Sequence, residues 1–318
     1  MPWRRLGFAL ACLTLTAPLV SLSGCTGSRT APAGAERPGT IVSYEEIRSR
    51  YNQRTSRLHR IWSRAVVSMR WQDEEGRSRS EQGEGHLQLE QPTKLALSAG
   101  KLGEILIWFG SDAERYWLID RTESKRAYFG RHDAISRRKL ASLGLPAAPS
   151  ELLTLLGIRN LPSEGTLAKA GWTVNVAQAG RGEGSDGSLV VELRGRTTLW
   201  RYVLEPKELL PTRIELWFVS SDAPTESRAH EVHRRRLLSA TLENYDDVEL
   251  KGVGGFFPKL AGRVRITDES SGAVLGLSLA GMSDKASRAE AFDLDSLLER
   301  LGPMDEIVDL DERLRVRD

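Results

Sequence analysis

The chain has 318 residues, of which 40% are hydrophobic and 28% are charged, and its formal net charge at pH 7 is +2. These proportions are ordinary for a soluble globular protein, and the length allows one large domain or two modest ones. The charge is close to neutral and the basic residues are scattered along the chain, so the composition does not indicate a nucleic-acid-binding protein.

Residues 1–24 predict an export signal. Arg4 and Arg5 precede an apolar run from Leu6 to Val20, which has the length of a signal h-region and is short for a membrane span. The tetrapeptide that ends at Cys25, LSGC, resembles the lipobox of bacterial lipoproteins. This resemblance implies cleavage before Cys25 and attachment of lipid, palmitate-like acyl chains included, to that residue. An ordinary cleaved signal followed by a chance cysteine is the alternative.

The residues after the signal predict a tether and a location. Thr26 stands where the inner-membrane retention signal of enteric bacteria has Asp, which favours the periplasmic face of the outer membrane. Residues 25–40 are small and polar with Pro and Gly, so we expect a flexible tether with a reach of roughly 20 Å. Cys12, the other cysteine, lies within the signal, so the body must be held together by its core.

Residues 41–318 are expected to form a single, mainly β domain. Ser43 and Glu46 fit a capping box that begins an amphipathic helix. Strand-like runs then follow, roughly eleven or more in all, at the spacing of barrels and sandwiches. They are interrupted between Ala134 and Ile158 by two predicted short helices, the first ending at Gly144 and the second opening at Ser150. A short helical segment, FDLDSLLERLG, and a closing EIVDLDE end the pattern.

The stretch from Gly103 to Arg121 predicts a hairpin that is apolar on both faces. Leu106, Trp108, Trp117 and Ile119 share the second face, where exposure to water would cost roughly 1.5–3 kcal/mol for each side chain. The two central helices are the expected cover. They are either a permanent plug or a movable cover over an apolar groove, and the eight tryptophans of the chain fit both interpretations.

Two motifs with glycine or histidine favour structural explanations. Gly182, Gly184 and Gly187 spell G-x-G-x-x-G, but a strand-like run follows them where a dinucleotide site needs a helix, so a hairpin loop is favoured. His230 and His233 are three residues apart in a predicted strand or the loop before it. Odd spacing on a strand places them on opposite faces, so a shared metal ion is not expected.

Two charged motifs are interpreted in the same way. Asp293, Asp295 and Glu299 could suggest a cation site, but carboxylates at the start of a short helix also complement its dipole, which is favoured. Arg234-Arg235-Arg236 could touch anionic lipid headgroups, but a solvated edge strand, on which the charges discourage edge pairing, is favoured.

Several phrases of the body resemble the bacterial lipoprotein carrier and receptor family, LolA/LolB-like: EQPTKLALSAG, RYWLID, RIELWF, FFPKLAGRVRI and FDL followed by EIVDLDE, over most of residues 43–312. The resemblance implies a strongly curved, incomplete antiparallel barrel, with the N-terminal helix and short helices covering its concave apolar face. It also implies a cavity that holds the acyl chains of lipoproteins or other lipids. Cys25 places the chain on the receptor side, which implies assistance in lipoprotein insertion into the outer membrane.

The sequence therefore predicts a lipid-anchored, non-enzymatic lipid-binding protein of the cell envelope. The expected partners are acyl chains, the membrane through the anchor and a soluble periplasmic carrier, with no nucleic acid, cofactor, metal ion or catalytic residue. A non-enzymatic envelope scaffold or stress-sensing lipoprotein with a filled core is the alternative. Besides the lipidation site Cys25, the candidate cavity residues are Leu106, Trp108, Trp117, Ile119, Leu152, Leu156, Trp200 and Trp217.

Overall fold

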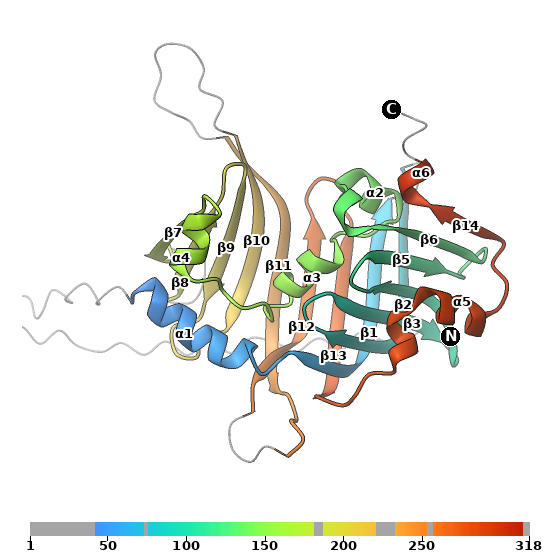
Figure 1. Cartoon of the computed structure of the whole chain (residues 1–318), viewed down its shortest axis with the longest axis horizontal. Coiled ribbons are helices and arrows are strands. Elements are labelled where there is room, and N and C mark those ends of the chain that lie inside the picture. The colour runs from blue at the N-terminus through green and yellow to red at the C-terminus, as the bar shows by residue number, and fades with distance from the viewer. Residues whose placement is uncertain (1–41, 73–75, 181–186, 221–232, 253–256, 314–318) are drawn as a thin grey trace, which may run out of the picture. The chain divides into compact units, whose positions relative to one another are not determined.

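The computed structural model describes residues 42–72, 76–180, 187–220, 233–252 and 257–313. Cys25, the tether, Gly182, Gly184 and His230 lie outside these ranges. The described residues contain 14 strands in one sheet, in the order β14-β6-β5-β4-β3-β2-β1-β13-β12-β11-β10-β9-β8-β7 (Figure 1). Neighbouring strands are antiparallel except for β14 and β6, which are parallel. β14 and β7 are free edges, so the predicted open, curved and mainly antiparallel sheet is confirmed.

The strands are β1 Arg60–Gln72, β2 Ser78–Glu90, β3 Lys94–Lys101, β4 Glu104–Ser111, β5 Arg115–Asp120, β6 Arg126–Arg131, β7 Thr173–Gln178, β8 Leu189–Arg194, β9 Thr198–Leu204, β10 Pro211–Ser220, β11 His233–Asp247, β12 Lys259–Asp268, β13 Val274–Ser283 and β14 Glu306–Asp309. The α-helices are α1 Tyr44–Thr55, α2 Arg137–Ser142, α3 Pro149–Leu155, α4 Glu164–Lys169, α5 Leu294–Leu301 and α6 Leu310–Arg313. Two short 3-10 helices are η1 His132–Ala134 and η2 Ala289–Phe292.

Helix α1 begins where the capping box predicts. The Ser43 hydroxyl accepts a hydrogen bond from the backbone N–H of Glu46 at 3.3 Å, and Tyr44, Ile47 and Tyr51 bury one side of the helix. The helix that follows Asp293 is also confirmed, because the Asp293 carboxylate accepts the N–H of Asp295 at 3.0 Å. No helix in the ranges that the structure describes is long and apolar enough to cross a membrane.

The sheet has an inner face, which curves around helices α1 to α4 (Figure 1). Along β1 the side chains alternate, with Ala65, Val67 and Met69 buried on this face and Val66 and Ser68 exposed on the other. A single apolar cluster joins the strands to all four helices. Burial of apolar area on this scale supplies the main free energy of folding.

The opposite, outer face of the β4–β5 hairpin is covered by the C-terminal segment. Trp108, Trp117 and Ile119 form a separate apolar cluster with Phe292 of η2 and Leu297 of α5. The expectation that the central helices cover this face is therefore wrong. The reason is topological, because the chain leaves β13 in the middle of the sheet and must cross the outer face to place β14 beside β6.

Close packing at Gly110 gives a first prediction. A Cβ atom at Gly110 would lie 2.7 Å from Cζ2 of Trp117, which is fully buried and has no room to move. We expect Gly110→Ala to lower the free energy of unfolding by about 1–3 kcal/mol through overpacking. Urea denaturation measures the change.

The matched control is Gly165→Ala in α4. A Cβ atom at Gly165 would meet nothing within 4 Å, so alanine should leave the stability unchanged or raise it by up to about 1 kcal/mol. Equal effects of the two substitutions would show that Trp117 does not constrain Gly110.

Candidate functional site

The candidate site is the interface between the inner face of the sheet and a helical cover, defined here as residues 137–161 with α2 and α3. Leu152, Leu153 and Leu155 of α3 are at most 1% exposed and belong to the same cluster as Leu97 and Phe109 of the sheet. Side chains from sheet and helices thus contact each other directly. The confirmed arrangement is a curved apolar surface with helices packed into it.

One end of the cover is held by a buried guanidinium. Arg54 of α1 donates from Nη2 to the carbonyl oxygen of Gly157 at 2.7 Å and from Nη1 to that of Lys259 at 3.1 Å. The Tyr51 hydroxyl donates to the same Gly157 carbonyl at 3.0 Å, and the Arg54 guanidinium lies 4.8 Å from the Tyr51 ring centroid. Burial raises the pKa of Tyr51, so its hydroxyl remains a donor at neutral pH. Arg54 therefore ties α1, the cover and β12 together.

The other end of the cover is held by an ion pair with the C-terminal helix. Nζ of Lys139 lies 2.6 Å from Oδ1 of Asp311 and also donates to the carbonyl of Ala134 at 2.7 Å. Between the two ends, Arg137 pairs with Glu151, and burial raises the pKa of the Glu151 carboxyl while Arg137 opposes that shift. A small number of polar contacts thus fixes a helical segment that is otherwise apolar on its inner side.

The structure does not bring the eight candidate cavity residues together. Leu152 and Leu156 lie in the inner cluster, and Trp200 packs against it while partly exposed. Trp108, Trp117 and Ile119 lie on the outer face, and Trp217 lies beside Glu215, whose carboxylate accepts from Nε1 at 3.1 Å. The sequence assigned residues to faces by counting along strands, and the counting holds only where the strands are regular.

Leu106 shows the effect of an irregular strand. The pairing of β3 with β4 shifts between Ala99 and Gly100, so that Ile107 pairs with Ala99 while Ile105 pairs with Gly100. The extra residue of this β-bulge, Leu106, lines a small hollow together with the inner-face residues Val67 and Met69, away from Trp108. A bulge leaves no signal in the alternation of apolar residues, so the sequence could not place this side chain.

The hollow beside Leu106 has a volume of about 10 Å³, which is space for a single water molecule. It is too small for hydrocarbon. Between the sheet and the cover, side chains of both layers are almost fully buried and belong to one apolar cluster, so binding of an acyl chain there requires the cover to move away from the sheet.

Two arginines of the Arg234-Arg235-Arg236 motif form ion pairs with carboxylates of nearby strands and loops. Arg236 pairs with Glu215 at 3.1 Å and with Glu269 at 2.9 Å, and Arg234 lies 3.7 Å from Glu192. The three arginines lie at the start of β11, which is between β10 and β12, so the expectation of an edge strand is wrong. Their ion pairs form a polar network along the surface of the sheet. Within the described ranges no group of three His, Cys, Asp or Glu side chains is placed to hold a metal ion.

No family model matches the chain, and no curated protein matches it. Solved structures similar to it include a LolA superfamily protein from Nitrosomonas europaea (14% identity, TM-score 0.44, 80% of this chain and 99% of that one). Others are a domain from Vibrio parahaemolyticus described as outer membrane lipoprotein-sorting (15%, 0.46, 79% and 97%) and a DUF1329 family protein from Desulfovibrio piger (13%, 0.44, 80% and 97%). The first of these carries the name of the family that the sequence phrases resemble. Such a likeness carries no inference about function, which must come from this chain's own residues.

Proposed function

We propose that this chain is a lipid-anchored, non-enzymatic protein of the bacterial envelope. In this proposal it accepts acyl chains between the inner face of its sheet and the helical cover, and it assists the insertion of lipoproteins into the outer membrane. The observation that carries the proposal is the cover itself: an apolar helical segment that lies on an apolar curved sheet and is held at its two ends by Arg54 and Lys139. Binding and release of a hydrocarbon chain need no catalytic group.

The free energy needed to lift the cover from the sheet is similar in size to the free energy gained by burying an acyl chain. Each buried leucine of the cover contributes roughly 1.5–3 kcal/mol, so lifting five of them from the sheet costs on the order of 10 kcal/mol. An acyl chain returns about 0.8 kcal/mol for each methylene that it buries, so a dozen methylenes recover a similar amount. An exchange that is nearly balanced allows both uptake and release. The leucines in question are Leu140, Leu152, Leu153, Leu155 and Leu156.

A specific observation favours a second candidate function. The leucines of the cover and the apolar side chains of the sheet beneath them are almost fully buried in one cluster. A protein in which this packing is permanent would be an anchored envelope scaffold or stress-sensing module. The two candidates differ in whether the cover opens.

Photolabelling tests the acyl-chain site directly. The mature protein, purified without detergent, is mixed with a diazirine analogue of palmitate and irradiated, and the labelled residues are identified by mass spectrometry. We expect saturable labelling of α3 and of inner-face residues such as Leu97 and Phe109, because a chain under the cover contacts both. Labelling confined to the exposed apolar residues Leu102 and Ile307, or no saturable labelling, would exclude the site and favour the scaffold.

Arg54→Met tests whether the cover opens as a unit. Methionine retains most of the aliphatic packing but removes both charge-assisted hydrogen bonds, which should raise the open fraction of the cover by about tenfold to hundredfold. Hydrogen exchange should accelerate in residues 149–158 while the β1–β2 pair stays protected, and the palmitate analogue should bind faster.

Arg48→Met is the matched control, because Arg48 lies on the same helix but, among the residues that the structure describes, pairs only with Glu45 on the helix surface. It should leave exchange in the cover unchanged. If Arg54→Met accelerates exchange equally throughout the sheet, the cover does not open separately.

Cys25→Ser tests the anchor. Because the thiol of Cys25 is the predicted attachment point and cleavage is predicted directly before it, this variant should lose incorporation of an alkyne-tagged palmitate and keep its signal segment, which mass spectrometry of the intact protein detects. Cys12→Ser, within the predicted signal, is the control and should be labelled and cleaved as the unaltered chain is. Labelling that persists in Cys25→Ser would disprove lipidation at this residue.

A further inference from the structure

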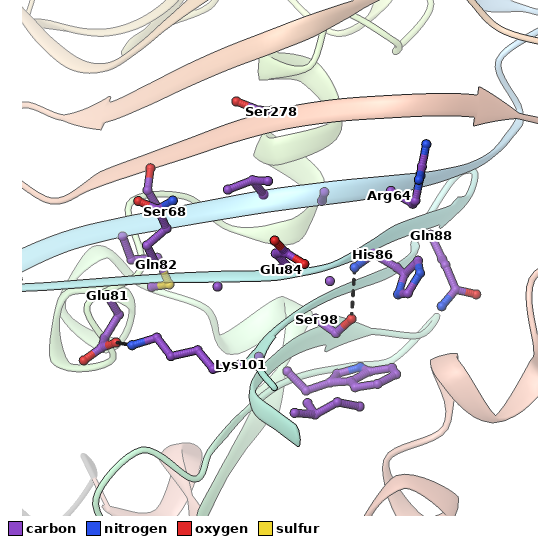
Figure 2. A pocket seen from close by; sticks show the side chains of 18 of the residues that line it. Arg64, Ser68, Glu81, Gln82, Glu84, His86, Gln88, Ser98, Lys101 and Ser278 are labelled. Carbon is purple, nitrogen blue, oxygen red and sulfur yellow. Dashed lines mark hydrogen bonds and ion pairs between the residues drawn. The ribbon is translucent and has the colours of Figure 1, made fainter. Parts of the chain in front are cut away.

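A second hollow lies on the outer face of the sheet, over the central strands β13, β1, β2 and β3. Its volume is about 1900 Å³, and we call it the outer-face groove. Figure 2 shows side chains that line it, among them Arg64, Glu84 and His86. Pockets for single small ligands typically have about 300–1,000 Å³, so this groove has room for several linked units.

The groove has a floor of strands and a wall from the C-terminal segment. Alternate outward residues of β1 and β2, such as Arg64 and His86, form the floor, where the two residues pair directly across the strands. Lys285, Arg288 and Arg300 line it from the segment that crosses to β14. The groove is thus separated by the sheet from the inner face and its helical cover.

The groove is positively charged. Its lining includes seven Lys and Arg side chains and three Glu side chains, an excess of four positive charges on a chain whose net charge is only +2. Two of the carboxylates are paired, Glu81 with Lys101 at 3.0 Å and Glu104 with Arg121 at 3.7 Å. Within the described residues, six of the seven cations have no carboxylate partner, and only Lys101 has one. Four of these six lie beside Trp62 or on the C-terminal segment: Arg64, Lys285, Arg288 and Arg300.

The pKa of His86 is affected by the cations of the groove. Its partial burial, followed by the charges of Lys285 and Arg64, lowers the pKa of its imidazole. Glu84, two residues along the same strand, also faces the groove and does not reverse the shift. Burial is the larger cause of the lowered pKa, and the two cations add to it, so an anion bound beside them would oppose their part of the shift.

The groove also presents a ring and hydrogen-bonding groups. Trp62 is partly exposed, with the His86 ring centroid 5.2 Å from its own and the Lys285 ammonium 4.7 Å above it. Gln88 and Ser98 supply an amide and a hydroxyl beside them (Figure 2). A flat ring, amide and hydroxyl groups and unpaired guanidinium groups match a ligand that has apolar ring faces, hydroxyls and acidic groups.

We propose that the outer-face groove binds an anionic oligosaccharide, a chain of sugar units that carry carboxylates or phosphates. The acidic groups pair with Arg64, Lys285, Arg288 and Arg300, and a sugar ring packs beside Trp62. A flat anionic membrane fits less well, because the cations line a hollow rather than a convex surface. The groove is independent of the acyl-chain site, since the two lie on opposite faces of the sheet.

Calorimetric titration of the full mature chain with a tetrasaccharide of galacturonic acid tests the proposal. We expect saturable binding that weakens with salt, and no binding of the neutral tetrasaccharide of N-acetylglucosamine. Arg64→Ala/Lys285→Ala should weaken binding at least about tenfold, because two charge-assisted contacts are lost. Both side chains are exposed, so the fold should be retained. In NMR titrations, the pKa of His86 should rise when the tetrasaccharide binds.

The matched control is Lys169→Ala/Arg196→Ala, which removes the same charge at exposed positions outside the groove and should bind as the unaltered chain does. Several results would overturn the proposal. The first two are unchanged affinity of the Arg64 and Lys285 double variant for the acidic tetrasaccharide, and equal affinity of the unaltered chain for the neutral one. The other two are full competition by inorganic phosphate at matched charge concentration, and preferential binding to vesicles of phosphatidylglycerol through the same residues.

Discussion

The β4–β5 hairpin must be shielded from water on both of its faces, and the other parts of the structure are arranged around that requirement. Phe109 and Leu118 face the inner cluster, while Trp108, Trp117 and Ile119 face outward. A single curved sheet cannot cover both sides of itself at this point. The chain therefore supplies two separate layers at this hairpin, the helix-containing inner cluster on one face and η2 with α5 on the other.

The two layers are attached to the sheet in different ways, and this difference matches the different functions proposed for them. The inner layer packs on the sheet through leucines and is fastened by a few buried polar contacts at its ends, above all by Arg54. Once those contacts break, such a layer can be replaced on the sheet by another apolar group, such as the proposed acyl chain. The outer layer packs through Phe292 and Leu297 but turns Arg288 and Arg300 toward the groove beside it. It is thus both a cover and the charged wall of a polar site.

Much of the fold could be predicted from local patterns, because alternation in β1, the capping box at Ser43 and the N-cap at Asp293 each depend on neighbouring residues. The doubly apolar hairpin also indicated correctly that a second cover exists. Which segment provides it depends on β14, a four-residue strand that pairs in parallel with β6. A strand of four residues is too short for a recognisable alternation of apolar and polar residues, so the path of the C-terminal segment could not be predicted from the sequence.

The candidate sites were less predictable than the fold, for similar reasons. Leu106 faces inward because it is the extra residue of a β-bulge in β4, and the residue types of β4 do not predict that bulge. Arg54 reads as an ordinary polar residue of a surface helix, and its role comes from two carbonyl groups more than 100 positions away in the chain. The outer-face groove joins residues of β1 and β2 to residues near position 290, a proximity that only the strand order creates.

The crossing of the C-terminal segment has a consequence for the time at which the molecule is completed. Residues 289–311 finish the outside of the hairpin through α5, add the edge strand β14 and anchor α2 through Asp311. These residues follow the strands and helices that they contact, so those elements are synthesised before their partners exist. Until residues 289–311 have been added, Trp108 and Trp117 lack their outer cover and α2 lacks its ion pair with Asp311.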